Sequence, residues 1–386
     1  MQSSSDATSL RQVAIDVMAG VELYVMVLSL VCGTASAQAP GAAPRCALPA
    51  VSAGGPLTTI THGSSTRSWY TYVPASVANS QAVVPLVVDL HGYGGCAVTL
   101  QKYSGWLAKA EEFGFIVVWP QAAVEPISVQ GLNTAWNAGG CCRFKVDNEG
   151  FGPSDDVDDV GFLREMVGQV AAAHPVNTNR IYFSGHSNGC MMAQRMLAEA
   201  SNLVAAVACF AGYLLAELSS TGYAPRPMMT IHGTADQTVP YVAGVLPHVP
   251  YVAGVLPHGP NPGAEENLAG WGGFNGCPGA ASTETALGSY NLHELDCNGV
   301  VSKLVELPGV GHYPFAAPEE NPLYNATIDG LGASFDTTQL AWDFVRAASI
   351  AVPIACPAFC VPADARQRRQ LLFASTVECP KGCVLA

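Results

Sequence analysis

The sequence predicts an α/β protein built around a mostly parallel sheet with helices on both faces. Short apolar runs recur along the chain, and stretches with helical spacing alternate with them. Several of the runs are apolar at nearly every position, which is typical of strands buried on both faces. Strands that alternate with helices form a parallel sheet covered by those helices. Such a sheet binds its ligands at the carboxyl ends of its strands.

The individual elements follow from these patterns. Apolar alternation predicts a half-buried strand over 68–74. Continuous apolar runs predict further strands, over 83–95, 113–121, 181–185, 203–212, 228–233 and 302–309. Helical spacing predicts helices, over 99–112, 158–173, 190–200 and 337–349.

Length and composition agree with a well-buried globule. The chain has 386 residues, of which 49% are hydrophobic and only 12% charged, which argues against extended disorder. The formal net charge is −13, and no cluster of Lys and Arg occurs outside the C-terminal tail. We therefore expect no nucleic-acid partner. Oligomeric state does not follow from these features.

The N-terminus has the pattern of a secretory signal. An apolar run over 20–33 precedes Ala35–Ala37, whose small residues suit a cleavage site, so we expect residues 1–37 to be removed and the mature protein to be secreted. A membrane anchor is the alternative, but the run is shorter than the roughly 20 residues of a bilayer span. After removal we expect no membrane association. The expected organisation is a leader loop over 38–57, one catalytic domain over 58–350 and a Cys-rich tail over 351–386.

Cysteine usage agrees with export. Of 13 cysteines, Cys32 leaves with the signal, and an even number in an exported chain predicts several disulfides. Cys277 and Cys297 flank a polar loop and are expected to pair, whereas Cys190 and Cys209 lie in apolar elements and are expected to be free, buried thiols. Four cysteines in the tail predict a disulfide-stapled helical hairpin or, alternatively, a zinc site: Cys356, Cys360, Cys379 and Cys383.

One stretch carries the main candidate for chemistry. Gly185–Gly189, "GHSNG", fits G-x-S-x-G and lies between a predicted strand and a predicted helix. This is the context of a nucleophile elbow, in which glycines avoid Cβ clashes at a strained turn. Ser187 is therefore a candidate nucleophile. The alternative is a Gly-rich turn without chemistry.

A serine nucleophile needs an imidazole to accept its proton and a carboxylate to orient that imidazole. His312, in "GVGHYPF", and Asp236, in "HGTADQTVPY", each follow a predicted strand. The order Ser187, Asp236, His312 is that of α/β-hydrolases. Two further histidines are assigned no proton transfer: His232 is expected in the core, and His186 is expected to pack or to face solvent.

The tetrahedral intermediate requires two donors to its oxyanion. We expect them to be the backbone N–H groups of Asn188, at the helix start, and of Tyr93, in "LHGYGG", with His91 orienting that loop. Trp136 and Tyr313 are candidates to line an acyl pocket, although aromatic residues more often belong to a core.

Four motifs in this order, "LHGYGG", "GHSNGCMMAQRM", "IHGTADQTVPY" and "GVGHYPF", resemble the secreted esterases that group polyhydroxybutyrate depolymerases with feruloyl and acetylxylan esterases (carbohydrate esterase family 1). "WNAGGCC" and "DDVGF" match it too, and the resemblance covers about 58–349. It implies an α/β-hydrolase fold with Ser187 as nucleophile, Asp236 as acid and His312 as base. The chain departs in having Tyr313 where the family usually has Trp, and in a tandem copy of "VPYVAGVLPH" after Asp236.

The expected function is thus that of a secreted serine esterase acting on an ester polymer, either a polyhydroxyalkanoate or a plant cell-wall polysaccharide such as feruloylated or acetylated xylan. No cofactor or metal is expected; the acidic run over 155–159 is interpreted as a helix cap, with a Ca²⁺ site as the alternative. Three other functions remain open. They are a serine peptidase of the same fold, an inactive binding or adhesion module, and a body that only carries a functional tail.

Overall fold

The computed structural model describes residues 46–80, 82–125, 133–139, 144–147, 150–153, 157–215, 222–244, 262–316, 335–350, 360–362 and 383–385. Contacts divide the chain into residues 1–47 and 48–386, and all the helices and strands that the structure describes belong to the second unit. The predicted signal segment, 1–37, lies outside the described residues. In the part of the chain that is described, no helix is long and apolar enough to cross a membrane.

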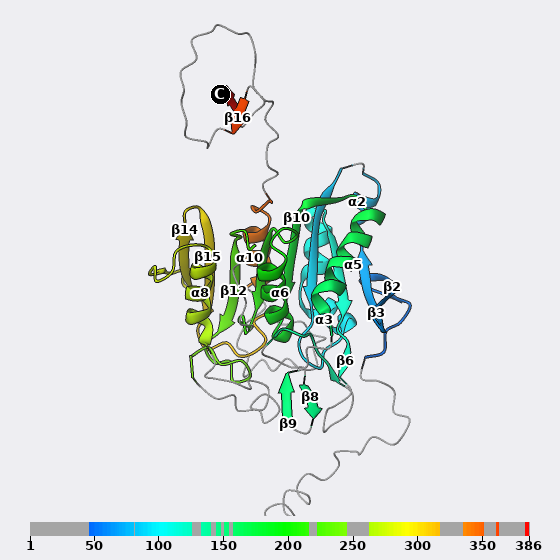
Figure 1. Cartoon of the computed structure of the whole chain (residues 1–386), viewed down its shortest axis with the longest axis horizontal. Coiled ribbons are helices and arrows are strands. Elements are labelled where there is room, and N and C mark those ends of the chain that lie inside the picture. Colours follow the sequence, from blue (N-terminus) through cyan, green and yellow to red (C-terminus); the bar gives the residue numbers. More distant parts are fainter. Residues whose placement is uncertain are drawn as a thin grey trace, which may run out of the picture. The chain divides into compact units, whose positions relative to one another are not determined.

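A single large sheet organises the described fold (Figure 1). Its strand order is β1-β2-β3-β5-β4-β10-β11-β12-β15-β14-β13. The six neighbours from β5 to β15 pair in parallel, while the strands on either side of them pair antiparallel. The strands are β1 (Val51–Ser52), β2 (Gly55–His62), β3 (Ser65–Tyr72), β4 (Val84–Leu90), β5 (Ile116–Gln121), β10 (Val176–Gly185), β11 (Ala206–Phe210), β12 (Met228–Gly233), β13 (Thr283–Ala286), β14 (Asn291–Cys297) and β15 (Val300–Leu307).

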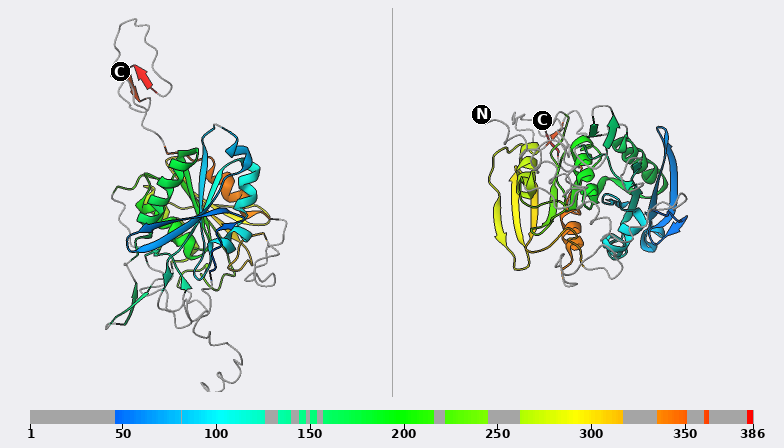
Figure 2. Two further views of the ribbon diagram at one scale, coloured as in Figure 1. Left: turned by 90° about the vertical axis from the view of Figure 1, so that its right-hand side faces the viewer. Right: turned by 90° about the horizontal axis from the view of Figure 1, so that it is seen from below.

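Helices cover both faces of the sheet, as Figure 2 shows in its right-hand view. Leu86 and Val88 of β4 pack on one side with α5 (Asp159–Ala173) and α6 (Asn188–Glu199), whereas Val87 packs on the other. Because successive strand residues point to opposite faces, one apolar run supplies both cores. The remaining helices are α2 (Ala75–Ala78), α3 (Ala97–Tyr103), α4 (Trp106–Phe113), α8 (Gly263–Phe274) and α10 (Thr337–Val345). The predicted α/β-hydrolase architecture is thereby confirmed.

The main sheet and its helices differ from the sequence prediction in the following respects. The helix expected over 99–112 is two helices, because Gly105 between them has φ 78°, a conformation that favours glycine. Part of the expected leader loop is strand, since β1 and the first residues of β2 lie within 38–57. The edge strands β13 and β14 and helix α8 were not predicted, because their sequences mix polar residues with few apolar ones.

Among the described residues, three short pairs of antiparallel strands form sheets separate from the main sheet. Two lie between β5 and α5 in sequence: β6 (Val124–Glu125) with β7 (Asn133–Thr134), and β8 (Phe144–Asp147) with β9 (Gly150–Pro153). In the tail, β16 (Cys360–Pro362) pairs with β17 (Cys383–Leu385). The two described pieces of the tail are therefore strands, and the helical hairpin expected there is wrong for them.

Candidate active site

Ser187 stands at the sharp turn between β10 and α6. Its backbone has φ 57° and ψ −121°, in the left-handed region that non-glycine residues rarely adopt. The N–H of Ser187 donates to Phe210 O at 2.9 Å, and the O of Ser187 accepts from the N–H of Met191 at 3.0 Å. These bonds hold the strained turn in place, and strain of this kind is concentrated at functional sites.

The glycines on either side of Ser187 are required by close backbone contacts. A Cβ atom on Gly189 would lie 2.0 Å from Leu90 O, and one on Gly185 would lie 2.6 Å from Gly189 O. Either contact is far shorter than a carbon and an oxygen can tolerate. The strand–turn–helix geometry predicted for "GHSNG" is therefore present, and both glycines are explained by it.

Two other strand ends bring Asp236 and His312 together. Asp236 follows β12 and His312 follows β15, and these strands are parallel neighbours. The Asp236 Oδ1 atom accepts from the N–H groups of Thr238 and Val239, each at 2.8 Å. The Asp236 Oδ2 atom accepts from His312 Nδ1 at 2.7 Å. The carboxylate is thus fixed by its own loop and pointed at the imidazole.

The electrostatics of Asp236 favour its charged form. Burial of this carboxyl would raise its pKa, but the positive charge that His312 can carry and the hydrogen bonds from His232 and His312 hold the pKa well below its ordinary value. Because a carboxylate only accepts, His312 must carry a proton on Nδ1, and its Nε2 is then left as a proton acceptor.

Two histidines pack against this pair. His232 is fully buried, as predicted, and its Nε2 lies 2.8 Å from Val239 O and 3.3 Å from Asp236 Oδ2. Both of those oxygens are acceptors, so Nε2 is protonated. His186 is 2% exposed, which confirms that it packs and excludes the solvent-facing alternative.

The loop over 91–95 passes close to Ser187. A Cβ atom on Gly92 would lie 3.3 Å from the Cβ of Ser187, so the backbone of the loop is in close contact with Ser187. His91 braces this loop, as expected. Its Nδ1 bonds Gly92 O at 2.8 Å, and its Nε2 accepts from the N–H of Ala122 at 3.1 Å. Burial lowers the pKa of His91 to about 4, so it stays neutral at ordinary pH.

Trp136 lies beneath this loop and has no exposed surface. Its indole Nε1 donates to His91 O at 2.9 Å, and its backbone exchanges two hydrogen bonds with the side-chain amide of Asn188, at 2.8 and 3.1 Å. Trp136 therefore ties the loop to the first residue of α6, with its indole ring fully buried. Tyr313 is half-buried and packs edge-on against Tyr103, with ring centroids 6.1 Å apart.

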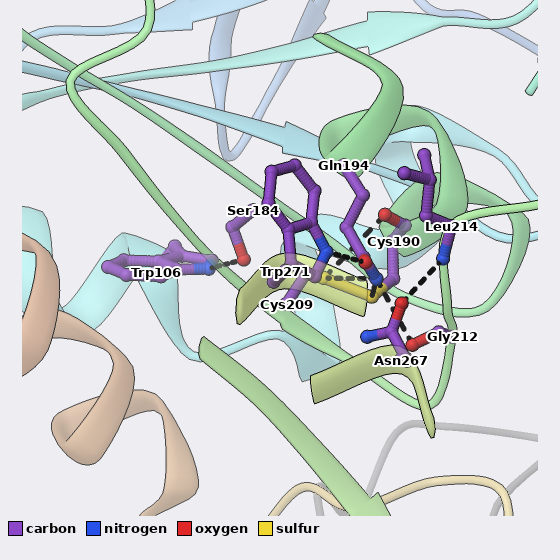
Figure 3. Close-up of a disulfide and its surroundings, with 9 residues drawn as sticks. All are labelled: Trp106, Ser184, Cys190, Gln194, Cys209, Gly212, Leu214, Asn267 and Trp271. Atoms are coloured by element: carbon purple, nitrogen blue, oxygen red, sulfur yellow. Dashed lines mark hydrogen bonds between the residues drawn. A yellow bond between two sulfur atoms is a disulfide. The ribbon is translucent and has the colours of Figure 1, made fainter. Parts of the chain in front are cut away.

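A disulfide joins Cys190 to Cys209, so the expectation of two free thiols is wrong. The two cysteines lie on α6 and β11, whose apolar faces meet with a Cα separation of 5.0 Å. Figure 3 shows Gln194 beside this bond: its Nε2 donates to Gly212 O at 3.2 Å, and its Oε1 accepts from Trp271 Nε1 at 2.7 Å. Sequence reasoning missed Gln194, whose signal is a polar residue on the apolar face of a helix.

The structure also tests the expectations for the second disulfide, the acidic run and the tandem copy. Cys277 and Cys297 form the predicted disulfide. Asp158 caps α5 by accepting from the N–H of Gly161 at 2.7 Å, as predicted, while Asp159 is buried against Arg67 at 2.6 Å. Of the first "VPYVAGVLPH" copy, residues 239–244 are described, and Val239 contacts Asp236 through its N–H; the second copy falls outside the described residues.

Potential metal ligands gather at the edge of the sheet, on β13, β14 and β15. Glu284, His293 and Glu306 place their ligand atoms within 4.8 Å of one another. His293 Nε2 donates to Glu306 Oε2 at 2.8 Å, so these side chains satisfy each other without an ion. Asp236 and His312 do not belong to this group.

Comparison with known proteins points to esterases. Residues 73–253 match the family model described as phospholipase/carboxylesterase. The chain is 27% identical over 270 residues to feruloyl esterase B of Piromyces equi, a match that covers 69% of this chain and 42% of that protein. It is 28% identical over 240 residues to the putative esterase NocK of Nocardia uniformis subsp. tsuyamanensis, covering 58% of this chain and 64% of that one.

Two further proteins are also similar to this chain. The bifunctional acetylxylan esterase/xylanase XynS20E of Neocallimastix patriciarum is 25% identical over 261 residues, which cover 65% of this chain and 31% of that protein. These matches therefore span less than two thirds of the length of each of the three curated relatives. A solved acetyl xylan esterase from Aspergillus awamori has 19% identity and a TM-score of 0.47, covering 69% of this chain and 96% of that one.

Proposed function

We propose that this chain, whose residues 73–253 match the phospholipase/carboxylesterase family model, is a secreted serine esterase with Ser187, His312 and Asp236 as its catalytic residues. The observation that carries this proposal is the 2.7 Å hydrogen bond from His312 Nδ1 to Asp236 Oδ2. Both residues follow the carboxyl ends of parallel strands, as does the strained turn at Ser187. A second tie supports it, because His186, the residue before Ser187, bonds the backbone O of His312 at 2.7 Å.

The proposed reaction is acyl transfer in two steps. Ser187 Oγ forms a bond to the ester carbonyl carbon as its proton passes to His312 Nε2, and the alcohol departs with that proton as the C–O bond breaks. Water then gives a proton to His312 and attacks the acyl-enzyme, which releases the acid and restores Ser187. Asp236 keeps His312 in the tautomer that accepts at Nε2 and stabilises the imidazolium formed in each step.

The proposed oxyanion hole combines the backbone N–H groups of Asn188 and Tyr93. Asn188 is the first residue of α6, where the helix dipole favours negative charge. Tyr93 follows Gly92, where a Cβ atom would lie 3.3 Å from the Cβ of Ser187. Trp136 binds Asn188 through two hydrogen bonds and the neighbouring His91 through a third, and we propose that it keeps the two donor positions in register. Tyr313, next to His312 and half-buried, is the proposed substrate contact.

For the substrate we propose an ester of a plant cell-wall polysaccharide, either feruloylated or acetylated xylan. The support comes from the names of two relatives, a feruloyl esterase and an acetylxylan esterase/xylanase. A polyhydroxyalkanoate remains the alternative polymer. Secretion is supported by the Cys190–Cys209 and Cys277–Cys297 disulfides, which need an oxidising compartment, together with the signal-like segment over 1–37. We propose a catalytic domain that reaches back to β1, followed by the tail over 351–386.

The test is hydrolysis of a substrate panel by the mature protein beside Ser187→Ala. The panel contains p-nitrophenyl acetate and octanoate, methyl ferulate, acetylated xylan and polyhydroxybutyrate. Loss of nearly all turnover in Ser187→Ala is expected, with the best wild-type substrate identifying the ester class. Wild type and Ser187→Ala that are equally inert on every member would contradict the proposal and favour a binding module.

A further inference from the structure

His186 directly links the nucleophile turn to the histidine loop. It precedes Ser187 in the chain, and its Nε2 lies 2.7 Å from the backbone O of His312. A carbonyl oxygen only accepts, so His186 Nε2 carries a proton and donates a hydrogen bond to this oxygen. The hydrogen bond spans 126 positions of sequence and fixes the main chain of His312 against the residue next to the nucleophile.

The other side of the imidazole is also satisfied. His186 Nδ1 lies 3.5 Å from the Tyr103 hydroxyl, which can donate to it. The ring packs against the rings of Tyr313 at 4.7 Å and Phe315 at 5.4 Å, and against that of His312 itself at 4.8 Å. Both residues flanking Pro314 are thus held by this one side chain.

The charge state of His186 is compatible with a fixed donor. Burial, and then the charge that His312 can carry, lower the pKa of His186 to about 3. The other titratable groups that act on it are Asp236 and His232, with the hydroxyl of Tyr103 at Nδ1. The ring therefore keeps one proton, on Nε2, throughout the working pH range of an esterase.

We propose that His186 is a positioning residue that sets the place of the His312 imidazole relative to Ser187 through its Nε2 hydrogen bond. This inference rests on the proposed function, because it assigns His186 a role in that same reaction. His312 lies on a loop rather than on a strand, so its backbone is not held by the hydrogen bonds between strands. An error of about 1 Å in such a catalytic group can lower a rate by roughly 100-fold.

A pair of variants separates this role from simple packing. His186→Phe keeps an aromatic ring among Tyr103, Tyr313 and Phe315 but removes the donor. His186→Gln loses the ring, yet its side-chain amide nitrogen falls near the position of the imidazole Nε2. We expect kcat on p-nitrophenyl acetate to fall about 10- to 100-fold in His186→Phe with KM within about twofold, and to be largely restored in His186→Gln.

The thermal midpoint of each variant gives the second readout. A packing role predicts the opposite order, with His186→Phe near wild type in both kcat and thermal midpoint and His186→Gln impaired in both; that order would overturn the proposal. Equal kcat losses in the two variants would overturn it too. Should His186→Phe not fold, His186→Asn replaces it, because its shorter amide reaches the Nδ1 position instead of Nε2. Failure of the proposed function itself would look different, since wild type would then be inert.

Discussion

His312 donates a hydrogen bond from Nδ1 to Asp236 Oδ2 across 2.7 Å, although 76 positions separate the two residues in sequence. The Asp236 side chain has no exposed surface, and 12% of the His312 side chain is exposed. The carboxylate is thus fully buried, whereas part of the imidazole is accessible to solvent. This asymmetry is what a base needs if it is to receive a proton from one group and pass it to a departing alcohol.

Replacing Asp236 with Asn should lower kcat by about 10³- to 10⁴-fold, because the amide can turn its NH₂ toward His312 and stabilise the wrong tautomer. Steady-state hydrolysis of p-nitrophenyl acetate measures this loss. Circular dichroism should show a folded protein, since the Oδ1 position can still accept from the N–H groups of Thr238 and Val239. A loss below tenfold in a folded variant would count against Asp236 as the triad acid.

Two glycine-to-alanine substitutions should have opposite effects on the free energy of unfolding. In Gly189→Ala the new Cβ meets backbone, Leu90 O, at 2.0 Å, so the turn must shift; we expect a loss of about 2 kcal/mol or more together with most of the activity. The control is Gly168→Ala on the exposed side of α5, where nothing lies within 4 Å. That change should gain about 0.5–1 kcal/mol, as alanine does in a helix.

Urea denaturation of both alanine variants provides the comparison, with esterase activity measured alongside. An unchanged stability and activity in Gly189→Ala would mean that the close approach of α6 to β4 is not as tight as the backbone contacts indicate. Equal destabilisation of the two variants would mean that loss of glycine as such, rather than position, decides the effect.

Two disulfides, Cys190–Cys209 and Cys277–Cys297, form a matched pair. Cys190–Cys209 and Cys277–Cys297 close loops of 19 and 20 residues, so removal of either should cost a similar free energy of unfolding, about 3 kcal/mol by the chain-entropy account. Only the first lies on the helix that begins after Ser187. Double alanine replacement of Cys190 and Cys209 should therefore also lower kcat, whereas that of Cys277 and Cys297 should leave kcat within about twofold of wild type.

Thermal midpoints and kcat values of the two double variants, measured under identical conditions, decide this point. A kcat that falls equally in both would show that general loss of stability, rather than support of the nucleophile turn, controls the rate. A thermal midpoint that falls in neither would contradict the loop-closure argument itself.

The free energy of unfolding should increase with pH between about 4 and 6.5, because three buried groups bind protons differently in the folded and the unfolded chain. Burial lowers the pKa of His91 to about 4 and of His186 to about 3, and it raises the pKa of Asp89 to about 7. In this range the unfolded chain binds two protons on the histidines that the folded chain does not bind. The folded chain binds one, on Asp89, that the unfolded chain does not. The net difference of one proton gives a slope of about 1 kcal/mol per pH unit.

Urea midpoints measured across that range test the slope, and Asp89→Asn tests its origin. Without the Asp89 carboxyl, only the two histidines should contribute to the pH dependence, and the slope should steepen to about 3 kcal/mol per pH unit. A slope that is flat in wild type and unchanged in Asp89→Asn would show that these buried groups do not titrate as their burial implies.

The sequence by itself determined the parts of this protein that depend on local pattern. Apolar runs such as those of β4 and β12, and the helical spacing of α5, are properties of neighbouring residues, so they predict strands and a helix without reference to the rest of the chain. The same holds for the strained turn at Ser187, because its glycines and its strand–helix context lie within a few residues of it. The order of Ser187, Asp236 and His312 then pointed to one known arrangement.

Only the tertiary structure decided which distant groups meet. Cys190 and Cys209 each look like buried thiols in their own segments, and they form a bond because α6 packs on β11. Trp136 looks like a pocket residue in sequence, yet its ring is fully buried, and its indole nitrogen and backbone bond His91 and Asn188. The link from His186 to His312 has no local signal at all. Contacts of this kind are set by the packing of whole helices and strands against each other, since distance in space is independent of distance along the chain.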